Sequence, residues 1–89
     1  MPQVTFAPAI QRHVAVPPLD VGGETVAAAL HDCLRQAPGL QAYLFDDQGR
    51  LRPHVTIFID GTMIRDRRAL SDRLQATSRV YVVQALSGG

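Results

Sequence analysis

Hydrophobic residues recur with helical spacing in one part of the chain, from Thr25 to about Gln36. The apolar positions, which follow at intervals of three and four residues, are Val26, Ala29, Leu30, Cys33, Leu34 and Ala37. This spacing places them on one face of an α-helix. Thr25 or Gly23 can cap the start of the helix, and Pro38 with Gly39 can end it. We therefore expect one amphipathic helix that packs against a hydrophobic core.

Three other stretches alternate apolar and polar positions, as half-buried β-strands do. They are QVTFAPA at 3–9, HVTIFID at 54–60 and RVYVVQAL at 79–86. The dipeptide Asp60-Gly61 predicts a tight hairpin turn, and TMI at 62–64 can be the short return strand. A further extended segment at 14–21 contains two prolines, so we expect it to be irregular or at a sheet edge.

Shorter segments connect these elements. AIQRH at 9–13, LQAYLF at 40–45 and ALSDRL at 69–74 are each predicted to form a single helical turn, and DDQGR at 46–50 is a turn. The order strand, strand, helix, strand, short strand, strand predicts an α+β fold, with a mixed sheet of four to five strands and one main helix across one face. We expect the first and last strands to lie side by side in its centre.

The uncovered face of this sheet follows from the alternation. If Val4, Phe6, Val55, Ile57, Ile59, Val80 and Val82 face the helix, then Thr5, Ala7, Thr56, Phe58, Tyr81 and Val83 face outward. Exposed apolar patches mark contact surfaces, and aromatic residues are favoured anchors in them. We therefore predict that Phe58, Tyr81, Val83 and Ala7 bind a partner protein. The alternative is that loops or a second copy of the chain cover this face.

Composition restricts the class of protein. The chain has 89 residues, enough for one domain, of which 46% are hydrophobic and 19% charged. Its formal net charge of +1 gives no support to bulk electrostatic binding of nucleic acid. It has no apolar run of membrane-spanning length and no basic region ahead of an apolar stretch, so we expect neither a membrane segment nor a signal peptide. A single cysteine fits a reducing, cytoplasmic setting.

Few residues in the interior of the sequence suggest chemistry of their own. Helical spacing places Cys33 on the buried side as a small core residue rather than a persulfide carrier. His13, His31 and His54 lack metal-ligand spacing, and Asp46 with Asp47 lies in a turn rather than across a cleft. RDRR at 65–68 is predicted to be a solvated loop, although it could contact phosphate or an acidic partner. We expect no bound metal or cofactor.

The end of the sequence is different. The last predicted strand leads through Ser87 into Gly88 and Gly89. Glycine has no β-carbon, so such a terminus can enter a narrow channel in another protein. We predict a domain at 1–86 and a flexible tail at 87–89; the alternative is that the glycines are the remnant of a linker. All nine basic residues are arginine, so the chain has no lysine amine to accept an acyl group.

Four segments together resemble the MoaD/ThiS family of ubiquitin-like β-grasp sulfur carriers. They are VTFAPAIQRH at 4–13, GGETVAAAL with CLRQAPGL at 22–40, GRLRPHVTIFIDG at 49–61 and ALSDRLQATSRVYVVQALSGG at 69–89. They cover nearly the whole chain in the order of that family. A terminal Gly-Gly alone would be a weak signal, but it is fairly specific behind a strand, a helix and an IDG motif.

The resemblance implies a β-grasp fold and a function at the C-terminus. A ubiquitin-activating-type enzyme would use ATP to adenylate the carboxylate of Gly89, and a sulfur donor would convert it to a thiocarboxylate. That sulfur would pass to a biosynthetic acceptor. The chain would be a protein cosubstrate and not an enzyme. Two alternatives stay open: a modifier joined to target lysines through Gly89, or a small subunit that completes a molybdopterin-synthase-like enzyme.

Overall fold

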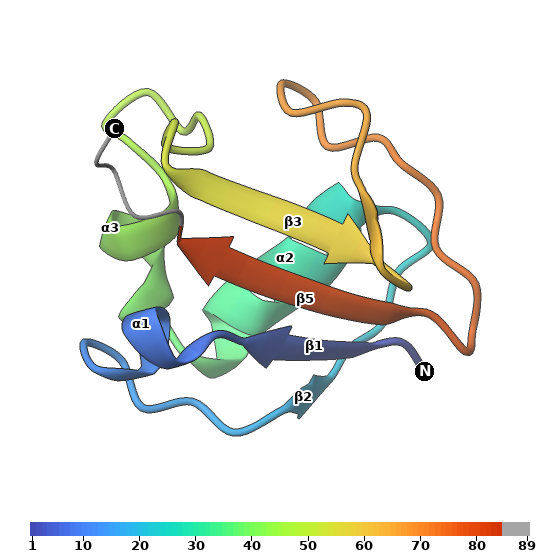
Figure 1. The fold of residues 1–89 in the computed structure, drawn as a ribbon, viewed down its shortest axis with the longest axis horizontal. Helices are drawn as coiled ribbons and strands as arrows, with labels where there is room; N and C mark the ends of the chain where they lie inside the picture. The colour runs from blue at the N-terminus through green and yellow to red at the C-terminus, as the bar shows by residue number, and fades with distance from the viewer. Residues whose placement is uncertain (85–89) are drawn as a thin grey trace.

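A computed structural model describes residues 1–84, and residues 85–89 lie outside the described part of the chain. The helices and strands are, in order, β1 (Gln3–Phe6), α1 (Pro8–Gln11), β2 (Leu19–Asp20), α2 (Val26–Gln36), α3 (Leu40–Leu44), β3 (Val55–Ile59), β4 (Thr62–Met63) and β5 (Arg79–Gln84). The strands form one layer, and α2 crosses behind one face of it (Figure 1). The predicted α+β arrangement is confirmed.

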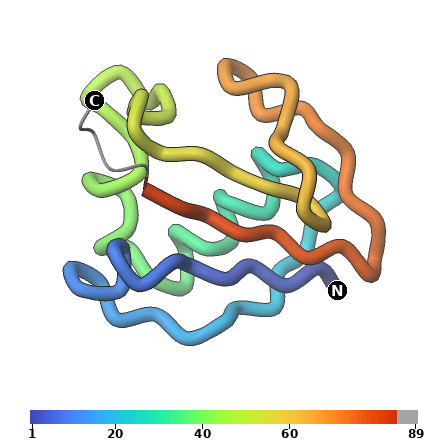
Figure 2. The backbone as a smooth tube through the Cα atoms, in the orientation of Figure 1, coloured from blue at the N-terminus to red at the C-terminus, as the bar shows by residue number. Residues whose placement is uncertain are grey.

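The sheet has five strands in the order β2-β1-β5-β3-β4. The central neighbours β1 and β5 are parallel, with Val4 opposite Val80, and the other pairs are antiparallel. The two ends of the described chain therefore run side by side, as predicted, and Figure 2 shows their backbones following one another. Strand β2 is an edge strand of only two residues, because Pro17 and Pro18 precede it and cannot donate to a ladder.

Helix α2 begins where the sequence predicts. Thr25 is the N-cap, and its hydroxyl oxygen accepts the backbone N–H of Ala28 at 3.2 Å. The N–H groups of Val26 and Ala27 donate to the carbonyls of Asp72 and Leu70 at 3.0 and 2.8 Å. These bonds satisfy three donors that a helix leaves free at its first turn, so the segment around Leu70 fixes this end of α2.

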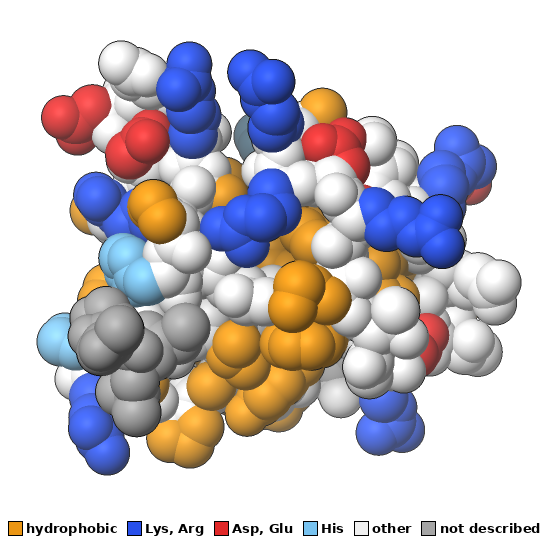
Figure 3. All heavy atoms as spheres, turned by 45° about the horizontal axis from the view of Figure 1, so that its top comes forward, with side chains coloured by type: hydrophobic (Ala, Val, Ile, Leu, Met, Phe, Trp, Pro, Cys, Tyr) orange, Lys and Arg blue, Asp and Glu red, His pale blue; other side chains and the backbone are white. Residues whose placement is uncertain are grey.

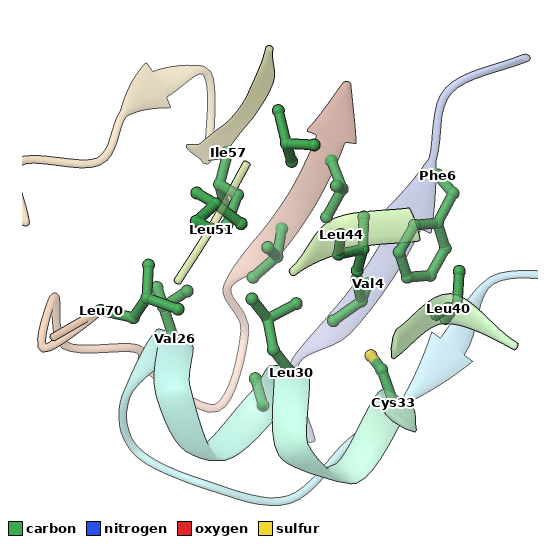
Figure 4. Packing of buried hydrophobic residues seen from close by; sticks show 14 of the residues in the cluster. Val4, Phe6, Val26, Leu30, Cys33, Leu40, Leu44, Leu51, Ile57 and Leu70 are labelled. Carbon is green, nitrogen blue, oxygen red and sulfur yellow. The ribbon is translucent and has the colours of Figure 1, made fainter. Parts of the chain in front are cut away.

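The core lies between α2 and the inner face of the sheet. Val26, Ala29, Leu30 and Cys33 of α2 are buried, and Figure 4 shows Leu30 and Cys33 directed towards the strands. The inward strand positions are also buried, except the half-buried Ile59; they are Val4, Phe6, Val55, Ile57, Val80 and Val82. The period-two alternation therefore assigned these faces correctly.

The hairpin between β3 and β4 has the predicted two-residue turn. Ile59 pairs with Thr62, which leaves Asp60 and Gly61 in the turn with φ angles of 49° and 87°. Both angles are positive, as a type I′ turn requires, and Gly61 adopts this conformation without a steric penalty.

The prediction of a helical turn at 69–74 is wrong. This segment has no helix; Arg73 forms an isolated bridge with Thr25, and Leu70 has a φ angle of +54°. The carbonyls of Leu70 and Asp72 bond the start of α2, so they are not available for a local helical turn. Leu70 and Leu74 are nevertheless buried. Among the described residues, no helix is long and apolar enough to cross a membrane.

Candidate functional site

An apolar surface lies on the face of the sheet opposite α2. The register of β3 and β5 places Phe58 opposite Tyr81 and Thr56 opposite Val83. Tyr81 is 41% exposed, and Phe58 and Val83 are half-buried. We call Phe58, Tyr81, Val83 and Met63 the outer-face patch. In Figure 3 a contiguous group of hydrophobic side chains occupies the lower centre of the molecule, below a band of arginines.

Met63 is a member of this patch that sequence reasoning missed. It pairs with Phe58 across the hairpin and is 54% exposed. A signal was present, because a two-residue turn at Asp60 and Gly61 places residues 58 and 63 opposite each other, on the same face of the sheet. Methionine adapts its shape to a partner surface, so Met63 suits a contact role.

The patch surrounds a shallow hollow of about 540 Å³, lined by Phe58, Asp60, Gly61, Arg79, Tyr81 and Val83. Its polar rim is held in place by the backbone. The N–H of Arg79 donates to the Asp60 carboxylate at 2.9 Å, and the N–H of Asp60 donates to the Arg79 carbonyl at 2.9 Å. An apolar centre with a fixed polar rim is the usual anatomy of a protein-binding surface.

Ala7 does not belong to the exposed patch, and its predicted place there is wrong. It is only 8% exposed. The alternation stops before it, because β1 ends at Phe6 and Ala7 is the N-cap of α1. The N–H of Ala7 donates to the carbonyl of Val82 at 2.9 Å, so its backbone still extends the pairing with β5.

The end of β5 nearest the predicted tail is braced by an aromatic pair. Tyr43 Oη donates a hydrogen bond to Oε1 of Gln84, the last described residue of β5. The ring of Tyr43 lies beside that of His13, with the centroids 4.8 Å apart. Gly89, the predicted site of adenylation, and the predicted tail residues Ser87 and Gly88 lie outside the described residues.

Cys33 has the structural role that its helical spacing predicts. It is fully buried among the core residues, and burial, together with the nearby charge of Asp32, raises the pKa of its thiol to about 12. The thiolate is the nucleophilic form of cysteine, so Cys33 is held in its unreactive state. Within residues 1–84, no group of three or more His, Cys, Asp or Glu residues is placed to hold a metal ion.

Several aspartates are instead held ionised by hydrogen bonds that shape loops. Backbone N–H groups lower the pKa of Asp46 and of Asp72 below the usual value. The Ser71 hydroxyl and backbone N–H groups lower the pKa of Asp66 to about 2. Because a proton-transfer group needs a pKa near the working pH, these carboxylates are poor candidates for acid–base catalysis.

Comparison with known proteins shows the fold. No family model and no curated protein matches the sequence. Among solved structures, SAMP1 from Haloferax volcanii has a TM-score of 0.81 and 22% identity, covering 99% of this chain and 98% of that one. A chain of the Amycolatopsis orientalis BexX/CysO complex has a TM-score of 0.82 and 17% identity, covering 100% of this chain and 100% of that one. Mycobacterium tuberculosis CysO has a TM-score of 0.80 and 19% identity, covering 97% of this chain and 100% of that one. The chain therefore has the ubiquitin-like β-grasp fold.

Proposed function

We propose that the protein is a sulfur carrier that a partner enzyme activates at its C-terminal glycine. One observation supports this most strongly: the outer-face patch lies on β3, β4 and β5, and β5 is the strand that the sequence continues into Gly88 and Gly89. An enzyme that binds Phe58 and Tyr81 would hold the carrier by a rigid surface on the strand that precedes the reactive terminus. The β-grasp fold shared with CysO and SAMP1 agrees with this proposal.

The chemistry requires two displacement steps. A carboxylate is a poor acyl donor, because its leaving group would be oxide. In the first step a carboxylate oxygen of Gly89 attacks the α-phosphorus of ATP, and pyrophosphate leaves. In the second step a hydrosulfide ion attacks the acyl carbon, and AMP leaves with its electron pair while a proton is released. The product is a thiocarboxylate, whose sulfur is a nucleophile for an acceptor molecule.

The carrier's own residues contribute recognition and presentation in this scheme. ATP is bound by the activating enzyme, so the carrier needs no cofactor and is a cosubstrate rather than a catalyst. The absence of a β-carbon at Gly88 and Gly89 suits a narrow enzyme channel. The acyl-adenylate also meets no lysine on its own chain, because the sequence contains none. This removes the commonest amine with which an activated terminus could react unproductively.

A second candidate function is protein modification, in which a lysine amine of a target attacks the activated Gly89 and forms an amide. The lack of lysine favours it slightly, since a modifier without lysine cannot build lysine-linked chains of itself. A structure neighbour described as a small archaeal modifier protein shares the fold.

Intact-protein mass spectrometry from the native host separates the two functions. Replacement of one oxygen by sulfur at Gly89 supports carriage, and Gly-Gly remnants on lysines of other proteins support modification. Growth with and without a sulfur source provides the control. A chain that is never thiolated, adenylated or conjugated, or that continues beyond Gly89 uncut, would contradict activation at this terminus.

A further inference from the structure

A second surface, separate from the outer-face patch, is lined by arginine. A groove of about 570 Å³ lies between the loops at 46–53 and 65–70, and its lining residues are Arg50, Leu51, Pro53, Arg67, Arg68 and Ala69. No acidic side chain is among them. The buried Leu51 and the exposed Pro53 and Ala69 give the groove its apolar lining, which we call its floor, and we call the three arginines its walls. We call this feature the arginine groove; none of its residues lines the outer-face hollow.

The aspartates around these arginines accept hydrogen bonds from the backbone. The Asp46 carboxylate accepts the N–H groups of Gln48 and Arg50 at 2.9 and 3.0 Å. The N–H of Arg50 first, and then that of Gln48 and the nearby charge of the Arg50 side chain, lower the pKa of Asp46. The Asp66 carboxylate accepts the N–H groups of Arg68 and Ala69 at 3.1 and 3.0 Å, and the hydroxyl of Ser71. The Asp72 carboxylate accepts the N–H groups of Arg65 and Asp66. These bonds fold the loop at 65–72. Within residues 1–84, none of the three groove arginines forms an ion pair.

Arg67 is also held in position. Its Nη2 donates to the carbonyl of Arg52 at 3.1 Å, and Arg52 Nε in turn donates to the carbonyl of Ala42 at 3.0 Å. A guanidinium has five N–H donors, so Arg67 is fixed by one of them and keeps others for a ligand. Ordering a long side chain before binding reduces the entropy lost when a ligand arrives.

We propose that the arginine groove binds an acidic segment of a partner protein. Carboxylates of the segment would pair with the three arginines, and an apolar side chain between them would rest on Pro53 and Ala69 and on what remains exposed of Leu51. A guanidinium matches a carboxylate through two parallel hydrogen bonds, and the apolar floor supplies the contact area that isolated surface ion pairs lack.

Charge and composition favour an acidic peptide over a nucleic acid. The net charge of the whole chain is only +1, so there is little long-range attraction for a polyanion. Among residues 1–84, none of those that line the arginine groove has an aromatic side chain on which a base could stack. A short segment that alternates carboxylate and apolar side chains fits both the walls and the floor.

The groove continues towards α2. A neighbouring hollow of about 280 Å³ shares Arg68 and Ala69 with it and is lined further by His31, Leu34 and Phe45. A bound segment can therefore extend from the loop at 46–53 along α2. Because this path avoids β3 and β5, one partner can occupy the arginine groove while another holds the outer-face patch.

The test uses the full chain, isotope-labelled for NMR, and a short synthetic peptide with glutamates on both sides of a central leucine. We expect the peptide to shift the amide signals of residues 50–52 and 67–69 and to leave those of Phe58 and Tyr81 unchanged. Arg50→Gln and Arg68→Gln should each weaken binding by about two- to five-fold, the range for exposed ion pairs. Arg12→Gln, on the exposed end of α1, is the matched control and should bind as the parent does.

Three outcomes would overturn the proposal. A peptide with glutamine in place of glutamate could bind equally well, the shifts could map outside the groove, or a single-stranded oligonucleotide or inorganic phosphate could bind the groove more tightly than the peptide. The Arg50→Gln and Arg68→Gln variants should fold as the parent does, because the side chains of Arg50 and Arg68 form no hydrogen bond within residues 1–84. The proposal also stands apart from activation at Gly89, since the peptide titration requires no activating enzyme.

Discussion

The phenol hydroxyl of Tyr43 donates a hydrogen bond to Oε1 of Gln84, across 41 positions of the sequence. It joins α3 to the last described residue of β5, the strand that precedes the diglycine terminus. The ring of Tyr43 is supported by His13, whose plane is inclined to it by 31°. Three separate segments of the chain therefore fix the point from which the terminus continues.

Removing this bond should lower stability modestly. We expect Tyr43→Phe and Gln84→Leu each to reduce the free energy of unfolding by about 1 kcal/mol, the net value of a typical hydrogen bond. The double variant should lose little more than either single variant, because both changes remove the same interaction. Chemical denaturation of all four proteins measures this coupling. Fully additive losses would show that the bond contributes nothing.

The outer-face patch should tolerate charge in the free protein but not in a complex. Phe58→Asp and Tyr81→Asp should each weaken binding to a ubiquitin-activating-type enzyme by about 2 kcal/mol or more, as loss of a central aromatic contact does. Calorimetric titration measures the binding. Gln41→Asp, exposed on α3, is the control and should bind normally. A sharp fall in the thermal midpoint of either patch variant would mean that its side chain belongs to the core.

Deleting Gly89 tests the reacting group separately from the surface. We expect the truncated protein to keep the thermal midpoint of the parent and to lose ATP-dependent activation, because no carboxylate then reaches the α-phosphate. ATP–pyrophosphate exchange with the activating enzyme reports the adenylation step alone. A truncated protein that still supports exchange would contradict adenylation at Gly89.

Two adjacent glycines before α2 should differ in their tolerance of alanine. Gly23 has a φ angle of +117°, and a β-carbon there would lie 2.6 Å from that of Ala28; at Gly22 a β-carbon would meet nothing within 4 Å. Gly23→Ala should therefore cost about 2 kcal/mol or more, and Gly22→Ala less than about 0.5 kcal/mol. Chemical denaturation compares them. Equal effects would show that the backbone before α2 can adjust.

The sequence predicted the fold correctly where the local pattern and the tertiary structure agree. The spacing around Leu30 predicted α2, and the alternation around Ile57 predicted both faces of β3. Prediction from the sequence failed where the backbone forms a hydrogen bond with a distant element. The segment at 69–74 was predicted to form a helical turn, but the Leu70 carbonyl accepts the N–H of Ala27 at the start of α2. The prediction that Ala7 faces outward was wrong for a related reason, because the alternation of apolar and polar residues does not show where a strand ends.

The outer-face patch and the arginine groove differ in how far the sequence predicts them. The outer-face patch was predictable in outline, because parity places Phe58, Tyr81 and Val83 together. The arginine groove was not, because its two walls come from separate loops that alternation and helical spacing do not describe. Its RDRR motif was visible in the sequence, but the position of Arg50 opposite that motif depends on how both loops fold.

The loop at 65–72 should respond to acid through Asp66. The pKa of Asp66 is lowered from 3.8 to about 2, first by the hydroxyl of Ser71 and then by the N–H of Ala69. A carboxylate with a lowered folded-state pKa stabilises the fold fully above its unfolded pKa, and this contribution is lost as the pH falls towards the folded value. The loop should therefore loosen between about pH 4 and pH 2, and not on the alkaline side.

Amide hydrogen exchange, followed by NMR across this range, measures the effect. The N–H groups of Arg68 and Ala69, which donate to Asp66, should lose protection as it becomes protonated. Asp66→Asn has no titrating group, so its response at these two amides should disappear. The N–H of Arg65, which donates to Asp72, is an internal control that should still respond, because hydrogen bonds also lower the pKa of Asp72. An unchanged acid midpoint at Ala69 in Asp66→Asn would mean that another group holds the loop.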